Sequence, residues 1–194
     1  MINNWKSYKK YLQADLEASG IADITCLEKI MDRRYRFYKS LRRTEYFTNC
    51  YSSVLGKFIA KILRFRHNML CNKYNWTIPI NVFEEGLAIV HVGTIVVSGN
   101  AKVGKNCRIN VCTNIGRASI NGGRDIGAPI LGDNVYLGPG VKIFGPVFIG
   151  SNTAIGANAV VNKSFPEGNC TIAGVPAKKV SGCTSERYIL RKKN

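Results

Sequence analysis

Residues 131–161 read LGDNVYLGPGVKIFGPVFIGSNTAIGANAVV, and a large aliphatic side chain recurs at every sixth position of this stretch. The recurring residues are Leu131, Leu137, Ile143, Ile149, Ile155 and Val161. The residue that follows is usually glycine, which tolerates positive φ at a tight corner. One inward aliphatic and one corner per hexad suit a short strand, and three hexads make one triangular coil. The repeat therefore predicts a mainly β protein in which stacked coils pair their strands in parallel, a parallel β-helix.

A β-sandwich is the ordinary alternative, but its strands alternate with period two and turn every 8–12 residues. The six-residue step also continues upstream through Val97, Val103, Ile109 and Ile115. Ile115 and Leu131 are 16 residues apart, which is not a multiple of six, so the chain must leave the coil between them. Residues 117–130, rich in Gly, Asn and Asp, are therefore predicted to form a protruding loop on the binding face.

The chain divides into three parts by composition. Residues 1–80 have few glycines and are predicted to be a helical N-terminal region, residues 81–181 the β-helix domain, and residues 182–194 a basic C-terminal tail. Residues 52–70 alternate apolar and basic side chains as an amphipathic helix does. The pattern favours a helix packed on the protein with solvated lysines, and leaves open a helix that makes peripheral contact with a membrane surface.

The overall composition narrows the function classes. The 194 residues carry 28 Lys and Arg against 12 Asp and Glu, a formal charge of +16 that attracts phosphate groups. A nucleic-acid binder would show a basic, aromatic-interleaved reading motif, and none appears, so no nucleic acid is expected as a partner. The seven cysteines contain no CxxC pair, and the N-terminus lacks an apolar signal segment, so reduced thiols and a cytoplasmic location are expected.

The hexad stretch, followed by AGVPAKKV at residues 173–180, is similar to the hexapeptide-repeat acyltransferases. A short helical region, then GLAIVHVGTIVVSGNAKVGKNCRI at residues 86–109, then a loop and the repeat resemble the serine O-acetyltransferase branch, which includes short sugar O-acetyltransferases. The resemblance implies a left-handed parallel β-helix, a homotrimer, and acetyl-CoA as co-substrate with no permanently bound cofactor.

His91 is the candidate catalytic residue. Counting six back from Val97 places it where the repeat otherwise has an aliphatic, so a core histidine is the alternative interpretation. The resemblance of HVGTIVV to the family's catalytic stretch implies instead that His91 is the general base. Its carboxylate partner stays open among Glu84, Glu85 and Asp125. The only other histidine, His67, is interpreted as structural, and two histidines do not make a three-His metal site, so no metal is expected.

The resemblance also implies where acetyl-CoA and the acceptor bind. CoA would run in a groove between subunits along glycine-containing turns, with lysines near its phosphates. The implied CoA residues are Gly138, Pro139, Gly140, Ala157, Asn158, Lys163 and Lys178. Arg124 and Asp125 of the loop are the candidate substrate-binding residues.

The acceptor is interpreted from departures from the serine-specific pattern. In serine acetyltransferases an Asp precedes the catalytic His and an Arg-His pair precedes the loop Pro. Here Val90 precedes His91, and Gly127 and Ala128 precede Pro129. Losing groups that pair with ammonium and carboxylate removes the strongest handles on an amino acid. The sequence therefore favours a sugar hydroxyl, in surface polysaccharide biosynthesis, with serine O-acetyl transfer as the alternative. A non-catalytic β-helix scaffold would leave His91 and AGVPAK without a role.

Overall fold

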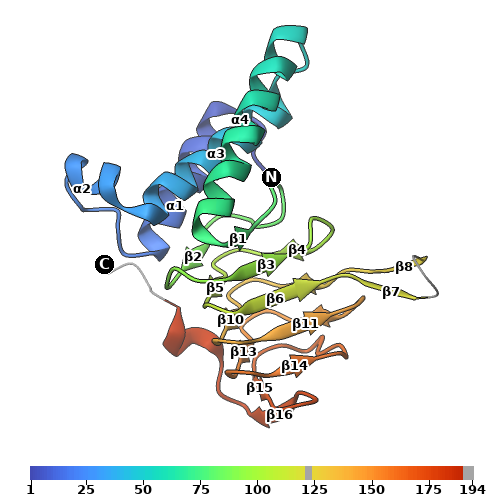
Figure 1. The fold of residues 1–194 in the computed structure, drawn as a ribbon. Helices are drawn as coiled ribbons and strands as arrows, with labels where there is room; N and C mark the ends of the chain where they lie inside the picture. Colours follow the sequence, from blue (N-terminus) through green and yellow to red (C-terminus); the bar gives the residue numbers. More distant parts are fainter. Residues whose placement is uncertain (121–123, 190–194) are drawn as a thin grey trace.

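The computed structural model describes residues 1–120 and 124–189, apart from the side chains of Cys26, Ile30, Ile120 and residues 124–126. Helices come first and strands follow (Figure 1). The helices are α1 (Trp5–Ala18), α2 (Cys26–Met31), α3 (Arg33–Cys50) and α4 (Val54–Tyr74). Each begins at a side-chain cap, provided by Asn4, Thr25, Asp32 and Ser53 in turn. Strand pairing begins at Trp76, inside the segment expected to be helical.

The strands form three sheets that the chain visits in rotation. The first sheet holds β1 (Trp76–Thr77), β3 (Ile95–Val97), β6 (Thr113–Gly116), β11 (Lys142–Phe144) and β14 (Val160–Val161). The second holds β4 (Lys102–Val103), β9 (Ile130–Leu131) and β12 (Phe148–Ile149). The third holds β2 (Ala88–Ile89), β5 (Arg108–Ile109), β10 (Tyr136–Leu137), β13 (Ala154–Ile155), β15 (Thr171–Ala173) and β16 (Lys178–Ser181). All pairs in these sheets are parallel except β15–β16, so the predicted parallel coil is confirmed.

The hexad aliphatics form buried columns, one inside each sheet. In the third sheet Ile89, Ile109, Leu137, Ile155 and Ile172 are in register and at most 1% exposed. In the first sheet the in-register residues, also at most 1% exposed, are Val97, Ile115, Ile143 and Val161. In the second sheet they are Val103, Leu131 and Ile149, at most 2% exposed. Burying such side chains, at roughly 1.5–3 kcal/mol each, is what holds the coil together.

The break in the repeat has a simple explanation. Ile115 and Leu131 lie on consecutive faces of one coil, and the step from one to the other is 16 positions instead of the usual six. The extra length forms an antiparallel hairpin of β7 (Ala118–Ile120) and β8 (Arg124–Gly127) rather than an irregular loop. The hairpin projects from the side of the coil, as predicted for residues 117–130 (Figure 1).

One corner of the coil is built on asparagine. Asn106, Asn134, Asn152 and Asn169 all adopt positive φ, between 47° and 58°. Each of the first three donates a hydrogen bond from Nδ2 to Oδ1 of the next, at 2.9 Å. Asparagine adopts this left-handed conformation more readily than most other L residues. The same four residues therefore form the turn of each coil and link successive coils by side-chain hydrogen bonds.

A buried charge cluster joins the helices to the first coil. The Arg42 guanidinium of α3 pairs with Asp15 of α1 at 2.7 Å and with Glu45 at 2.9 Å, and donates to the carbonyl of Phe83 at 2.8 Å. Asp15 in turn accepts from the backbone N–H groups of Gly86 and Leu87, at 2.9 and 2.8 Å. Burial raises the pKa of Asp15, against the lowering effect of Arg42. The cluster thus anchors the strand that leads to His91.

The helix expected over residues 52–70 runs from Val54 to Tyr74 and packs differently from the prediction. Its buried residues are Gly56, His67, Cys71 and Tyr74. Leu55, Phe58 and Phe65, which the sequence placed on the packed face, are between 61% and 68% exposed. The apolar pattern was correct, but the face that contacts the protein is the opposite one.

The remaining expectations concern cysteines, membranes and the tail. The six cysteines whose side chains are described are unpaired. Within the described part of the chain, no helix is long and apolar enough to cross a bilayer. The tail begins with a 3-10 helix, Ser185–Tyr188, that docks on the coil through a Tyr136–Tyr188 stack at 4.3 Å between ring centroids. Residues 190–194 of the predicted tail lie outside the described residues.

Candidate active site

His91 lies at the corner between β2 and β3, with its side chain exposed. The prediction that it occupies an aliphatic position of the repeat was wrong, because that position belongs to Ile89. Ile89 and Val97 are eight residues apart, not six, so this corner is two residues longer than the regular ones. The exposure of the imidazole also excludes the alternative of a core histidine.

Backbone hydrogen bonds show where the two additional residues of this corner lie. Val90 N–H donates to the Ile109 carbonyl at 3.1 Å, and Cys112 N–H donates to the Thr94 carbonyl at 2.6 Å. These bonds keep both ends of the corner in register with the coil beneath, so the two extra residues bulge out between them. A Cβ on Gly93 would lie 2.8 Å from Val111 Cγ1, so glycine is needed where the bulge rejoins the coil.

The same corner recurs on every coil, and we name the stack the histidine corner: residues 90–94, 110–112, 138–141, 156–159 and 174–176. Gly140 N–H donates to the Val111 carbonyl at 2.9 Å, and Asn158 N–H donates to the Pro139 carbonyl at 2.8 Å. Five of the CoA residues implied by the resemblance, namely Gly138, Pro139, Gly140, Ala157 and Asn158, therefore lie on the stack that His91 begins. At about 4.8 Å per coil, they are about 10 and about 14 Å along the stack from it.

Small residues leave this stack accessible along its length. A Cβ on Gly138 would lie 2.8 Å from the backbone nitrogen of Ala157, so adjacent corners are in backbone contact. Pro139, Ala157 and Asn158 are exposed. The histidine corner thus forms a strip with exposed residues on successive coils, and it begins at an imidazole.

The two implied lysines lie in different places. Lys178, in β16, pairs with Ala173 at the end of β15 and so lies beside the histidine corner. Lys163 lies on the next corner of its coil, after β14, with its ammonium 5.6 Å from the Phe165 ring centroid. The coil therefore does not bring Lys163 to the strip within one chain. Arg124 and Asp125 are placed in β8, but their side chains lie outside the described residues.

Two polar residues, one in the histidine corner and one directly after it, escaped the sequence reasoning. Asn110 is 5% exposed and donates from Nδ2 to the Leu137 carbonyl at 2.9 Å, one coil below Val90. The Lys142 ammonium donates to the Cys112 carbonyl, between the coil of His91 and that of Gly140. Asn110 directly follows the hexad aliphatic Ile109, and Lys142 directly precedes Ile143. This adjacency is the only sequence signal that points to them.

Neither glutamate proposed as a partner of His91 lies near it. Glu84 and Glu85 occupy the other end of β2, where Glu84 binds the Tyr11 hydroxyl and the N-terminal ammonium. Burial raises the pKa of Glu84, but these hydrogen bonds outweigh it and hold the pKa below its usual value. Glu85 pairs with Lys10 at 2.9 Å and Lys105 at 3.5 Å. Asp125 lies outside the described side chains, so no partner carboxylate is assigned.

His67 is structural in this fold. It is buried in α4, with Nε2 3.2 Å from the Ile78 carbonyl and Nδ1 3.3 Å from the Ser40 hydroxyl. Burial lowers its pKa. It therefore helps to fix α4 to α3 and to the segment that enters the coil.

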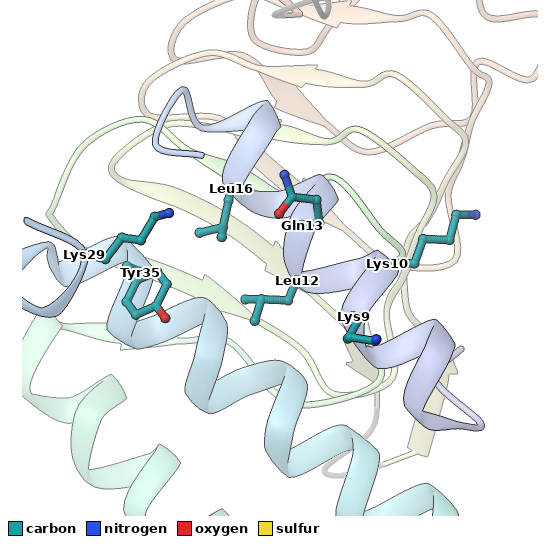
Figure 2. A pocket seen from close by; sticks show the side chains of 7 residues that line it. All are labelled: Lys9, Lys10, Leu12, Gln13, Leu16, Lys29 and Tyr35. Atoms are coloured by element: carbon teal, nitrogen blue, oxygen red, sulfur yellow. The ribbon is translucent and has the colours of Figure 1, made fainter. Parts of the chain in front are cut away.

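A hollow in the helical region lies away from the histidine corner. It measures about 560 Å³ and is lined by Lys9, Lys10, Leu12, Gln13, Leu16, Lys29 and Tyr35. Figure 2 shows these side chains on α1 and on the helices facing it, with Leu12 and Leu16 toward the interior. None of the implied catalytic or CoA residues lines it. Among the described residues, no group of three His, Cys, Asp or Glu side chains is arranged to hold a metal ion.

Chemically, the histidine corner combines a proton acceptor with an extended binding strip. An imidazole can take a proton and return it near neutral pH. Backbone groups and small side chains on the coils below suit a long, thin ligand rather than a compact one. These features fit the acyl-transfer site that the resemblance to the hexapeptide-repeat acyltransferases implies.

Comparison with known proteins shows more narrowly what the chain is similar to, namely serine acetyltransferases. No family model matches it. It is 36% identical over 92 residues to a serine acetyltransferase of Mycobacterium tuberculosis, covering 47% of this chain and 39% of the relative. It is 33% identical over 96 residues to that of Synechococcus elongatus, covering 50% and 38%. The chain thus spans about two fifths of the length of these relatives.

The fold is similar to solved serine acetyltransferases over most of the chain. A structure from Neisseria gonorrhoeae has a TM-score of 0.67 at 27% identity, covering 92% of this chain and 68% of that one. A second structure of that protein, in complex with serine, has a TM-score of 0.66 at 26% identity, covering 91% and 70%. One from Brucella abortus, in complex with coenzyme A, has a TM-score of 0.67 at 26% identity, covering 93% and 71%. The expected resemblance is confirmed.

Proposed function

We propose that the protein is an acetyl-CoA-dependent O-acetyltransferase with His91 as general base, built on a coil that winds left-handed. The observation that carries the proposal is the exposed imidazole of His91 at the top of the strip formed by the histidine corner. The likeness to a serine acetyltransferase solved with coenzyme A supports it.

In the proposed reaction, His91 accepts the proton of the acceptor hydroxyl while its oxygen attacks the thioester carbonyl of acetyl-CoA. The tetrahedral intermediate then collapses, the C–S bond breaks, and the imidazolium returns the proton to the CoA thiolate. Proton transfer of this kind contributes typically 10²–10⁴-fold, and positioning on the strip contributes the rest. The lengthened corner aids the step because it carries the imidazole clear of the coil.

The pantetheine arm of CoA would follow the strip past Gly140 and Asn158, toward Lys178. Glycine and small side chains let the arm approach the backbone closely. Lys163 lies on another corner, so it serves CoA only across an interface between protomers. This placement supports a site shared between copies in a homotrimer.

Serine is the acceptor that the comparisons favour. The relatives are serine acetyltransferases, and one neighbour was solved with serine. They give no support to the sugar acceptor and the role in polysaccharide biosynthesis that the sequence favours, and the stated alternative is the better supported.

A sugar hydroxyl remains a second candidate on one observation. Val90, Gly127 and Ala128 stand where serine-specific relatives were expected to carry charged or imidazole groups. An amino acid zwitterion bound there without partners would lose about 1–3 kcal/mol of binding free energy for each charged group, because each group gives up its water without compensation. A sugar carries no such charges.

The test is a CoA-thiol release assay with L-serine, other amino acids, nucleotide sugars and oligosaccharides as acceptors. Saturable release with L-serine and none with glycans supports the serine assignment. The reverse result supports the sugar. Absence of acceptor-stimulated release across the whole panel, by protein that still binds CoA, contradicts O-acetyl transfer to either class.

A further inference from the structure

One face of α4 carries a continuous apolar stripe that points away from the protein. Its members are Leu55, Phe58, Ile62, Phe65 and Met69, each between 44% and 68% exposed. Steps of three and four residues place them on one side of a helix, over about 21 Å of its length. The residues that α4 buries against α3 and the first coil lie on the opposite side. The helix is therefore apolar on two faces, and only one of them is covered.

Basic side chains border this stripe, which we name the α4 stripe. Lys57, Lys61, Arg64 and Arg66 are exposed, and α4 contains no acidic residue. In the described part of the chain, none of these four forms an ion pair. An apolar face bordered by free cations is typical of helices that lie in the plane of a membrane interface.

A second copy of this chain is a poor occupant for the stripe. The spacing would suit a helix pair, with Leu55, Ile62 and Met69 alternating with Phe58 and Phe65 along the seam. Lys61 and Arg66 flank that seam, so a paired copy would bring like charges together, which is destabilising. The +16 charge of each chain adds to this repulsion. The charge favours an anionic occupant.

Aromatic side chains near the beginning of α4 point to the same kind of surface. Trp5 is 55% and Tyr51 41% exposed, and both rings pack on Tyr46, at 5.6 and 5.5 Å between centroids. Trp and Tyr are enriched at the level of lipid headgroups, where one side of the ring is apolar and the other is wet. In Figure 1, α4 begins at the end of the molecule opposite β16.

We infer that the α4 stripe docks on an anionic lipid bilayer, with its apolar side chains among the acyl chains and its lysines and arginines at the phosphates. No helix spans the bilayer in this arrangement; α4 lies along it. The inference does not depend on the proposed enzymatic function. It would place the histidine corner near acceptors or products that are themselves bound to a membrane.

The test is co-sedimentation with vesicles of phosphatidylcholine and phosphatidylglycerol, compared with vesicles of phosphatidylcholine alone. The informative variant is Phe58→Ser with Phe65→Ser, which removes apolar area and keeps every charge. The matched control is Leu27→Ser with Met31→Ser, two exposed apolar residues of α2 (each 72% exposed) outside the stripe. We expect wild type and control to bind the anionic vesicles alike, and the stripe variant to bind at least about ten-fold more weakly.

Two further measurements keep the outcomes distinct. Thermal unfolding and CoA-thiol release without vesicles should be unchanged in the stripe variant, since its side chains are exposed and remote from His91. Equal vesicle binding by wild type and stripe variant would overturn the inference, because it would show that net charge alone accounts for binding. Absence of vesicle binding by wild type would also overturn it. A smaller sedimenting species for the stripe variant would overturn it in favour of a second copy of the chain as the occupant.

Discussion

At the scale of single residues, the position of one imidazole depends on two inserted residues. The aliphatic column of the third sheet passes through Ile89, so His91 is displaced to the outside of the coil. Val90 and Thr94 keep the register with the coil beneath, which restricts the bulge to the middle of the corner. The insertion thus places an exposed imidazole outside the coil without interrupting the buried column.

Replacement of this imidazole tests its role. We expect His91→Ala to lower kcat about 10²-fold or more, because no other group takes the proton of the acceptor, while CoA affinity changes little. The melting temperature should not change, since the side chain is exposed. Steady-state CoA-thiol release and thermal unfolding measure the two effects.

Val92→Ala is the matched control for this substitution. It shortens the other residue of the bulge, a side chain 44% exposed, and leaves the imidazole in place. We expect activity within a few-fold of wild type. If His91→Ala instead retained nearly full kcat, or if both variants lost activity equally, the general-base assignment would fail.

At the scale of elements, the asparagine ladder stabilises one whole edge of the coil. Asn134 accepts from Asn106 and donates to Asn152, each at 2.9 Å, while its own backbone has a φ of 55°. The side chain therefore meets two requirements at once, a left-handed backbone and continuity between coils. Ser185 also donates to the Asn134 carbonyl, so the ladder holds the C-terminal 3-10 helix.

Two substitutions separate these requirements. Asn134→Ala loses both amide hydrogen bonds and keeps a Cβ in the left-handed region without the polar side chain that favours asparagine there, at a cost of up to roughly 1–2 kcal/mol for the backbone and about 1 kcal/mol for each bond. Asn134→Gly loses the bonds alone, so the free energy of unfolding should fall less. Chemical denaturation measures both.

Asn162→Ala, an exposed asparagine outside the ladder and without positive φ, provides the baseline and should change stability by less than about 0.5 kcal/mol. Equal destabilisation by Ala and Gly at position 134 would show that backbone conformation contributes nothing there. Destabilisation of Asn162→Ala to the same extent would remove the special role of the ladder.

At the scale of the whole molecule, the coil has flat outer faces that carry apolar side chains. Ile130 and Phe148 are paired in the second sheet and point outward, 48% and 41% exposed. Paired exposed apolar residues on a flat sheet suit contact with another protomer. The separation of Lys163 from the histidine corner also favours a CoA groove completed by a neighbour.

We therefore expect a cyclic homotrimer at micromolar concentration, with the CoA-dependent activity confined to that species. Sedimentation velocity measures the mass, and assays of fractions from size exclusion measure the activity. A monomer with undiminished activity would contradict both the assembly and the shared groove.

Much of the fold was determined by the sequence alone, because its information is local and periodic. A six-residue beat of aliphatics with small residues at the corners specifies strands, inward faces and parallel stacking without knowledge of distant contacts. The same beat located the hairpin, as a break in phase between Ile115 and Leu131. His91 and five corner residues of the strip were likewise proposed from the sequence, because family motifs are written in consecutive residues, and their roles stay predictions.

Other properties were decided only by the tertiary structure. Counting by six assumes corners of equal length, so it placed His91 inside the coil until the register of Ile89 with Ile109 showed the insertion. The resemblance implied Lys163 as a CoA residue, and Glu85 was one of the candidate partners of His91, but the order in which the chain visits the three sheets puts both on other corners. The amphipathic pattern of α4 could not show which face α3 would cover, because periodicity specifies that a face is apolar and only packing against a partner determines whether it is buried.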